Sequence, residues 1–269
     1  MTAKMKLAIA GVAGRMGRQL ASAALEAGHT ITGASEAPGS DAIGAPLAKL
    51  IPGASGEVTP HADVAKAARG ADVWIDFTRP AATLEALKQL KAAGVKAVVI
   101  GTTGFDAGEE AEIVEAASEL SIVKAGNYSL GVNLLCALTK RAAESLGEDW
   151  DIEVLETHHR RKVDAPSGTA LMLGDAAAAG RGADLKTLRQ PPYDGPDAAR
   201  EAGKIGFSVR RSGGVIGEHE VTFGSEKEVL TLAHSALDRS VFAHGALAAA
   251  RWALRQPPGL YDMNDVLGL

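Results

Sequence analysis

The segment from Glu156 to Ala170 holds the densest set of chemically active side chains in the sequence. It reads Glu-Thr-His-His-Arg-Arg-Lys-Val-Asp-Ala-Pro-Ser-Gly-Thr-Ala, so two histidines, two arginines and a lysine follow one another directly. A histidine can serve as a general acid near neutral pH, and the neighbouring cations can hold an anion. A basic run is more often a solvated loop, so the residues after it decide between the two interpretations.

Ser167, Gly168 and Thr169 come shortly after this run and mark the start of a predicted helix near Thr169–Ala179. The first turn of a helix presents backbone N–H groups that have no acceptor within the helix. Next to histidine, arginine and lysine side chains, such a helix start is a site for a carboxylate or a phosphate. The segment is therefore predicted to bind an anion.

A glycine-rich loop joins the first predicted strand, Lys6–Ala10, to the first predicted helix, Met16–Ala27. Gly11, Gly14 and Gly17 have the spacing G-x-x-G-x-x-G, a variant of the dinucleotide-binding fingerprint. Glycine lets the backbone turn sharply and approach a pyrophosphate, to which the helix start offers N–H groups. Taken alone, the loop is also compatible with an ordinary glycine-rich turn.

Glu36 follows the next predicted strand, His29–Ser35. An acid at this position can accept hydrogen bonds from the ribose of an adenosine. Together with the glycine loop it predicts nucleotide binding. Together with the basic segment it indicates a reductase that acts on a small anion, with a histidine or the lysine supplying the proton.

Three further loops follow predicted strands, at Phe77–Thr78, Gly101–Gly104 and Ala125–Tyr128. Ligands of open parallel sheets bind at the carboxyl ends of the strands. We therefore expect these loops to line one crevice with the glycine loop, although each of them alone reads as turn chemistry.

The elements that carry these loops alternate between strands and helices in the first half of the chain. The other strands predicted here are Ala71–Phe77, Val95–Ile100 and Ser121–Ala125. One helix begins near Pro80, and another begins after Asp106, which has Glu109 at the spacing of a capping box. Such alternation is typical of parallel βαβ units, so this half is predicted to be α/β with a doubly wound parallel sheet.

The pattern changes after residue 128. A long helix is predicted over Leu130–Leu146, and most of the chain between that helix and residue 238 reads as strands: Asp151–Glu156, Ile205–Arg210, His219–Phe223 and Val229–His234. A last helix, Arg239–Leu254, is expected to return to the first domain. The prediction is a nucleotide-binding domain over 1–128, joined by 239–269, and an α+β domain over 129–238 on an open mixed sheet that faces solvent or a partner.

The composition sets the class of protein. The chain has 269 residues, of which 46% are hydrophobic and 23% charged, as in a globular protein of two domains. Its net charge of −5 gives no general attraction to nucleic acid or to an anionic membrane. No apolar stretch is long enough to span a membrane, and a single cysteine, Cys136, excludes an internal disulfide. We expect a cytoplasmic protein with neither a nucleic-acid nor a membrane partner.

The string E-x-H-H-x-x-K-x-D-A-P-S-G-T-A resembles the signature of the dihydrodipicolinate reductase family, also called 4-hydroxy-tetrahydrodipicolinate reductases. The resemblance extends over nearly the whole chain. Its further motifs are G-x-x-G-R-M-G at Gly11–Gly17, I-D-F-T at Ile75–Thr78, G-T-T-G-F at Gly101–Phe105, N-Y-S-x-G-V-N at Asn127–Asn133 and G-E-H at Gly217–His219.

The resemblance implies a Rossmann domain for NADH or NADPH, a substrate domain, and assembly as a homotetramer. It implies reduction of the dehydrated cyclic dicarboxylate to tetrahydrodipicolinate in the diaminopimelate route of lysine biosynthesis. His158 would then be the acid/base and Lys162 a proton donor, whereas substrate would be bound by His159, Ser167, Gly168 and Thr169. The cofactor would be bound by Gly11, Val12, Ala13, Gly14, Arg15, Met16, Glu36, Gly101, Thr102, Thr103, Ala125, Gly126, Asn127 and Tyr128. Whether such an enzyme also catalyses the loss of water that precedes reduction stays open.

One position departs from the family pattern. Many members have an arginine directly after the ribose-binding acid, but here Ala37 follows Glu36. A guanidinium can pair with the 2′-phosphate of NADPH, whereas a carboxylate alone repels it. We therefore expect NADH to be used at least as well as NADPH, with Arg15 as the one nearby cation that could substitute.

Two alternatives remain from the residues alone. Another dehydrogenase on the same scaffold could use a thiohemiacetal, but Cys136 lies in an apolar helical stretch and is expected to pack in the core. A nucleotide sensor without activity would keep the glycine loop but would not need His158 and Lys162. No metal site is predicted, because the adjacent histidines have no third ligand at a usual spacing and the later histidines have no acidic partner motif.

Overall fold

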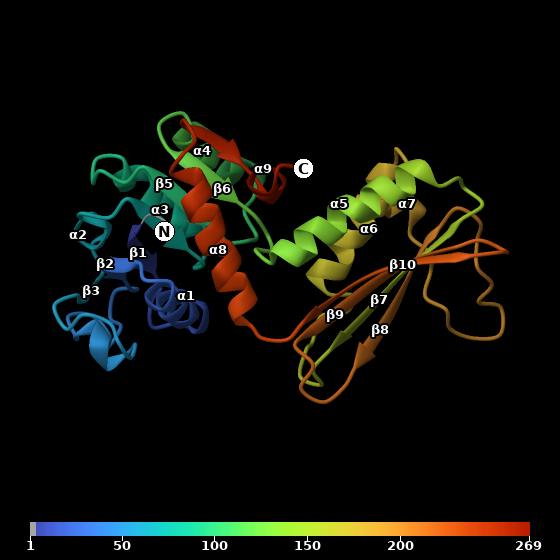
Figure 1. Cartoon of the computed structure of the whole chain (residues 1–269), viewed down its shortest axis with the longest axis horizontal. Coiled ribbons are helices and arrows are strands. Elements are labelled where there is room, and N and C mark those ends of the chain that lie inside the picture. Colours follow the sequence, from blue (N-terminus) through green and yellow to red (C-terminus); the bar gives the residue numbers. More distant parts are fainter. Residues whose placement is uncertain (1–3) are drawn as a thin grey trace. The chain divides into compact units, whose positions relative to one another are not determined.

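The computed structural model describes residues 4–269, so the first three residues of the predicted first domain lie outside it. The chain divides into two compact units. The first contains residues 4–129 and Ser240–Gly268, and the second contains Leu130–Arg239 (Figure 1).

The first unit is built on a seven-stranded sheet whose paired strands all run parallel, in the order β11-β6-β5-β4-β1-β2-β3. The strands are β1 (Lys6–Ala10), β2 (Thr30–Ser35), β3 (Pro60–His61), β4 (Val73–Asp76), β5 (Ala97–Ile100), β6 (Ser121–Lys124) and β11 (Gly259–Tyr261). The helices are α1 (Arg15–Glu26), α2 (Val64–Ala68), α3 (Pro80–Leu90), α4 (Ala107–Ala116), α8 (Ser240–Ala253) and α9 (Met263–Leu267), with a short 3₁₀ helix at Leu47–Lys49.

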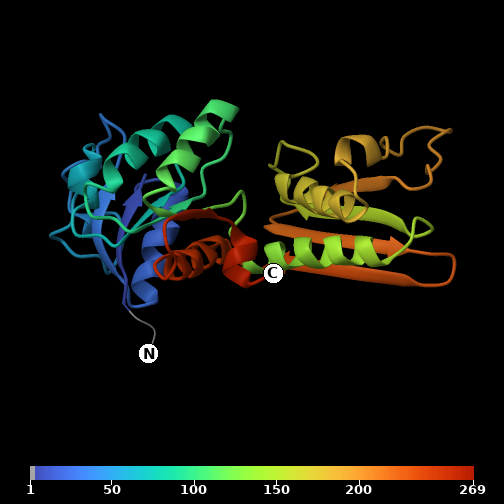
Figure 2. The ribbon, with the colours of Figure 1, turned by 90° about the horizontal axis from the view of Figure 1, so that it is seen from above.

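Helices cover both faces of this sheet, with α1 and α8 on one side and α3 and α4 on the other (Figure 2). Successive residues of a strand point to opposite faces. Leu7 and Ile9 of β1 therefore pack into the cluster that contains α1 and α8, and Ala8 and Ala10 pack into the other cluster. Because both faces are buried, the strands read as continuous apolar runs rather than as alternating ones.

The second unit has a mixed four-stranded sheet in the order β10-β9-β7-β8. Its elements are α5 (Leu130–Ser145), β7 (Asp151–His158), α6 (Gly168–Gly180), α7 (Leu185–Leu188), β8 (Ile205–Arg211), β9 (Gly217–Gly224) and β10 (Val229–Ala236). β8 pairs parallel to β7, while β9 pairs antiparallel to both β7 and β10. Figure 2 shows α5 and α6 side by side along one face of the sheet, where they close a cluster around Val154, Val221 and Phe223.

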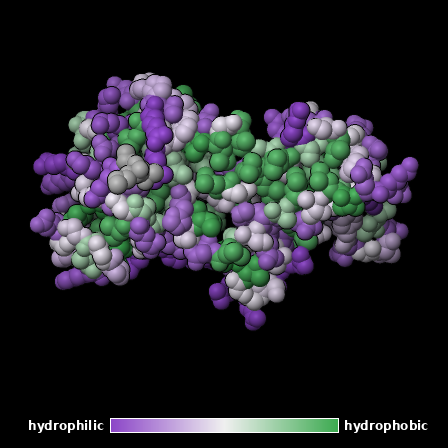
Figure 3. Space-filling model, in the orientation of Figure 1, coloured by the Kyte–Doolittle hydropathy of each residue, from purple (hydrophilic) through white to green (hydrophobic). Residues whose placement is uncertain are grey.

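Apolar side chains gather over α5 on the face drawn in Figure 3. Three leucines spaced four residues apart on this helix, Leu130, Leu134 and Leu138, are between 39% and 46% exposed. On the sheet, Val229 of β10 is 64% exposed. The second unit therefore presents apolar surface on a helix and on an edge strand.

The predicted fold class is confirmed, and the differences concern short elements. The capping box of Asp106 and Glu109 starts α4, as predicted. The elements β3, α2, α7, β11 and α9, all of five residues or fewer, were not predicted from the sequence. Strand β7 extends two residues beyond Glu156, its predicted end. None of the helices in residues 4–269 combines the length and the apolarity needed to cross a membrane.

Candidate active site

The catalytic segment begins inside strand β7 rather than after it. Residues two apart in a strand share a face, so Glu156 and His158 continue the row formed by Ile152 and Val154, which lie in the core. Glu156 is 1% exposed and His158 is 8% exposed. The end of β7 thus brings a carboxylate and an imidazole to the same side of the sheet.

The two oxygens of Glu156 have different partners. Oε2 is in hydrogen-bond contact with Nδ1 of His158. Oε1 accepts from the backbone N–H of Ser167 at 2.9 Å and from Nη2 of Arg211 at 3.0 Å. Arg211 reaches this point because the parallel register of β7 and β8 places it opposite His158.

The chain turns back after β7 and returns Lys162 to the same region. The backbone N–H of Lys162 donates to the carbonyl of His159 at 3.1 Å. Its ammonium lies 2.9 Å from Oδ2 of Asp164, whose carbonyl in turn accepts from Arg211 at 2.6 Å. Lys162 and Arg211 are both close enough to lower the pKa of His158. Lys162 is therefore close to the end of the sheet, whereas Arg160 and Arg161 are exposed.

Helix α6 begins at this place. Ser167 is its N-cap, and its hydroxyl accepts from the N–H of Ala170 at 3.2 Å. Gly168 and Thr169 form the first turn, whose N–H groups point out of the helix. Gly168 is exposed, and a side chain added to it would meet nothing within 4 Å, so there is free space beside this residue. The Ser167 side chain itself is buried and lies 3.2 Å from Nε2 of His219 on β9.

Burial and neighbouring charges together determine the pKa of each of these groups. Burial alone would raise the pKa of Glu156, but the hydrogen bonds from Arg211 and Ser167 and the neighbouring His158 outweigh it and lower the pKa. Burial lowers the pKa of His158, and Glu156 opposes that effect. Burial, followed by the nearby His158, lowers the pKa of His219 to about 4. The carboxylate is held ionised, and His219 is neutral at pH 7.

The loops predicted to bind a nucleotide lie together in the first unit, at the carboxyl ends of neighbouring parallel strands. Gly11 has a positive φ of 60°, and a side chain on Gly17 would run into the backbone of Gly11. The N–H of Ala13 donates to Oε1 of Glu36 at 2.6 Å, so the acid after β2 reaches the glycine loop. Nε of Arg18 donates to the carbonyl of Ala13 at 2.8 Å, which adds a cation that was not predicted from the sequence.

The strand-end loops contact one another through side chains that serve the fold. Oγ1 of Thr102 accepts from the N–H of Thr78 at 3.0 Å, and the Tyr128 hydroxyl lies within 2.9 Å of two strand carbonyls. Val12, Thr102 and Tyr128 are at most 4% exposed. The side chains of these three predicted cofactor residues are therefore buried in the fold.

Cys136 and a separate hollow lie away from these sites. Burial raises the pKa of Cys136 to about 11, which disfavours a thiolate nucleophile.

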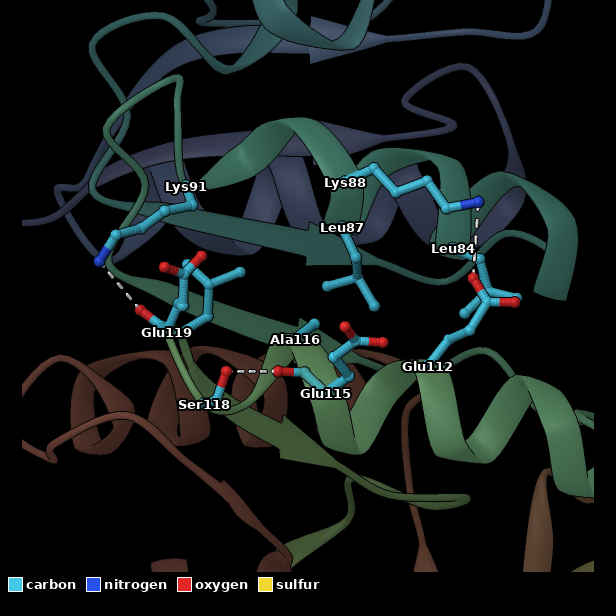
Figure 4. Close-up of a pocket in the computed structure, with 10 residues that line it drawn as sticks. Leu84, Leu87, Lys88, Lys91, Glu112, Glu115, Ala116, Ser118 and Glu119 are labelled. Atoms are coloured by element: carbon cyan, nitrogen blue, oxygen red, sulfur yellow. Dashed lines mark hydrogen bonds and ion pairs between the residues drawn. The ribbon is translucent and has the colours of Figure 1, made fainter.

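A hollow of about 440 Å³ lies between α3 and α4 (Figure 4). Its lysines are already engaged, because Lys88 pairs with Glu112 at 3.5 Å and Lys91 donates to the carbonyl of Glu119 at 3.2 Å.

The structure also corrects the spacing argument against a metal ion. Glu156, His158 and His219 each offer a ligand atom, and these atoms lie within 4.8 Å of one another. The third ligand and the acidic partner missing from the sequence are thus supplied by the sheet. Both oxygens of Glu156, however, already accept hydrogen bonds or contact an imidazole.

Sequence reasoning gave no role to Glu156, Arg211 or His219. An i, i+2 pair of Glu156 and His158 would have been visible if the strand had been extended by two residues. His219 is part of the G-E-H motif, but the sequence alone assigns it no function. Nothing in the sequence around Arg211 indicates a role for it, because its contact with Glu156 joins residues 55 positions apart.

Comparisons with known proteins identify the family of this chain. Residues 5–128 match the family "Dihydrodipicolinate reductase, N-terminus" and residues 131–267 match "Dihydrodipicolinate reductase, C-terminus". The chain is 51% identical to the 4-hydroxy-tetrahydrodipicolinate reductase of Roseobacter denitrificans over 271 residues, covering 100% of this chain and 99% of the relative. It is 50% identical to that of Caulobacter vibrioides over 269 residues, with the same coverage.

Solved structures share the fold. A dipicolinate-bound dihydrodipicolinate reductase from Paenisporosarcina sp. TG-14 superposes with a TM-score of 0.76 at 23% identity, covering 97% of this chain and 98% of the other. An amine dehydrogenase from Mycobacterium smegmatis superposes with a TM-score of 0.65 at 16% identity, covering 97% and 96%. The two family matches together cover almost the whole chain, and each of the two relatives aligns with all of it. The chain therefore belongs to the dihydrodipicolinate reductase family.

Proposed function

We propose that this protein is a 4-hydroxy-tetrahydrodipicolinate reductase. It would use NADH or NADPH to reduce the dehydrated cyclic dicarboxylate to tetrahydrodipicolinate in the diaminopimelate route of lysine biosynthesis. The observation that carries the proposal is the Glu156–His158 pair beside the open first turn of α6, in a chain that also holds a nucleotide-binding glycine loop. About half of all residues are identical in curated relatives with this activity.

The glycine loop fits a dinucleotide. A side chain on Gly17 would collide with the loop backbone, and α1 begins at Arg15 with its N–H groups at the same place. Gly11 to Met16 would hold the pyrophosphate, and Glu36 the adenosine ribose. When bound, the nicotinamide supplies the hydride. The backbone of Gly101–Thr103 and Ala125–Tyr128 would complete the cofactor site.

The second unit would bind and protonate the dicarboxylate. The N–H groups of Gly168 and Thr169 suit one carboxylate, Lys162 offsets the remaining negative charge, and His159 would contact the substrate beside them. Ser167 contributes by fixing the start of the helix, since its hydroxyl is buried. Reduction of the conjugated ring leaves an electron-rich species that must take up a proton, for which His158 is the acid and Lys162 a second donor.

We further propose that NADH is used at least as well as NADPH. Glu36 adds negative charge near the ribose, and Ala37 supplies no cation. Arg15 is exposed, and Arg18 is already bonded to the carbonyl of Ala13. Neither arginine follows Glu36, the position from which a guanidinium would pair with a 2′-phosphate.

The reaction is proposed to need no metal ion, because Arg211, Ser167 and His158 already engage the Glu156 carboxylate. Activity should therefore survive dialysis against a chelator.

We also propose a cytoplasmic homotetramer. The exposed leucines of α5 and Val229 on β10 support burial against other copies, and light scattering after gel filtration would measure the mass.

A coupled assay tests the activity. The substrate is generated enzymatically, oxidation of NADH or NADPH is followed by absorbance, and tetrahydrodipicolinate is identified by mass spectrometry. Substrate-dependent oxidation with formation of this product is expected. No oxidation above the substrate-free rate with either cofactor would overturn the proposal.

A further inference from the structure

Glu156 divides its two oxygens between two tasks. Oε2 contacts Nδ1 of His158, while Oε1 accepts from the N–H of Ser167 and from Arg211. The carboxylate is 1% exposed, so water does not compete for these bonds. A buried carboxylate with every oxygen engaged holds its partners in fixed positions.

We propose that Glu156 is the positioning residue that keeps a proton on Nδ1 of His158 and thereby assigns proton exchange with the substrate to Nε2. The role deepens the proposed function and rests on it. An ionised carboxylate only accepts hydrogen bonds, so the ring nitrogen that faces it must carry the proton.

The surroundings of Nε2 agree with this assignment. Within residues 4–269 this nitrogen makes no hydrogen bond, whereas Nδ1 is bonded to Glu156. Nε2 lies beside Gly217, where an added side chain would come within 3.1 Å of it. Glycine at this position leaves room next to the nitrogen that exchanges the proton.

Arg211 and Ser167 determine how Glu156 can be replaced. Both are donors and both point at Oε1. In Glu156→Gln, the amide oxygen must therefore occupy that position, which turns the amide NH₂ group toward His158. An NH₂ group donates to Nδ1, so the ring proton would move to Nε2 in the neutral form. The substitution keeps the shape of the site and reverses the tautomer.

The same substitution changes the charge around His158. The charged or titratable groups that face this ring are Glu156 on β7, Lys162 in the following loop, Arg211 on β8 and His219 on β9. Glu156 is the one anion among them, and it favours the protonated ring. Its neutralisation removes the negative charge that favours the protonated ring, while Lys162, which remains paired with Asp164, and Arg211 still disfavour it. The protonated form of His158 is therefore lost at a lower pH.

The structure offers a matched control on the same strand. Glu153 of β7 also pairs with an arginine, Arg200, and its Oε1 accepts from the Tyr193 hydroxyl at 2.5 Å. It lies three residues before Glu156 and so faces the opposite side of the sheet. Glu153→Gln removes the same charge from the same strand without touching His158.

The test compares both variants with the parent by steady-state kinetics and by ¹⁵N NMR of the histidine rings. Glu156→Gln should lower kcat by about 10²-fold or more, within the range of general acid catalysis. KM should change less than threefold, because Oε1 still holds Ser167 at the start of α6. The pH at which kcat/KM declines should move to lower pH, and the neutral His158 ring should carry its proton on Nε2. Glu153→Gln should match the parent in all of these.

Two results would overturn the proposal. One is a neutral His158 that keeps its proton on Nδ1 in Glu156→Gln; the other is a kcat loss that is equal at every pH and shared by Glu153→Gln. The NMR measurement needs no substrate turnover. The parent could lack reductase activity while the His158 proton still moves from Nδ1 in the parent to Nε2 in Glu156→Gln. That result would refute the proposed function and leave the positioning of His158 by Glu156 intact.

Discussion

At the scale of single residues, the proposed chemistry depends on a histidine whose neighbours set its charge. His158 is buried at the end of a strand, bonded to one carboxylate and flanked by Lys162 and Arg211. The histidine and the lysine could be predicted, because their types and spacing form a compact string. Glu156, Arg211 and His219 could not be assigned, because their roles arise from strand alternation and from register between distant strands.

Lys162→Ala should lower kcat and raise KM together. The lysine would supply both a proton donor and a positive charge facing a dianion, and Ala removes both. Lys186→Ala, on the short helix α7, is the charge-matched control. Initial rates over a range of substrate concentrations measure both constants. If kcat and KM both equal those of the parent, Lys162 is only a surface charge.

The pH dependence follows from the direction of the His158 pKa. As the acid, His158 must be protonated, so kcat/KM should fall as the pH rises through its pKa, which burial places below 6.5. A bound dianion favours the protonated ring, so the corresponding decline in kcat should lie at a higher pH. Full pH–rate profiles measure both. A kcat/KM decline centred above 6.5 would contradict the burial argument.

At the scale of elements, the sequence predicted the long strands and helices because each buries a continuous apolar surface. The elements that it missed have two to five residues. Such short pieces have little pattern of their own, and pairing fixes them: β3 is held by β2 and β11 by β6. The glycine loop between β1 and α1 could be predicted because its backbone requires glycine, through the positive φ of Gly11 and the close approach at Gly17.

The end of β2 is proposed to select the cofactor. Ala37→Arg should shift the ratio of kcat/KM values toward NADPH by about ten- to a hundredfold, since a charge-assisted hydrogen bond contributes about 1.5–3 kcal/mol. Initial rates with both cofactors at fixed ionic strength measure the ratio, and Ala45→Arg, farther along the chain after β2, is a matched control. A parent that already strongly prefers NADPH would show that another residue, such as Arg15 or Arg18, binds the phosphate.

At the scale of the whole molecule, the loop proposed to bind the cofactor and the histidine proposed to transfer the proton lie in different units of one chain. The glycine loop lies in the unit that contains residues 4–129, and His158 lies in the unit Leu130–Arg239. The sequence indicated this division through the change from alternating strands and helices to a strand-rich pattern. Replacing His158 should therefore lower the rate of reduction without weakening the binding of the cofactor.

The most direct test measures NADH oxidation by the parent and by His158→Ala, with and without enzymatically generated 4-hydroxy-tetrahydrodipicolinate, alongside the Kd for NADH. The parent should oxidise NADH only with substrate, and His158→Ala should be slower by about 10²–10⁴-fold. The Kd for NADH should agree within a factor of two, because His158 lies outside the glycine loop. A parent without substrate-dependent oxidation, or a variant with parental kcat, would contradict the proposed role of His158 in this reductase.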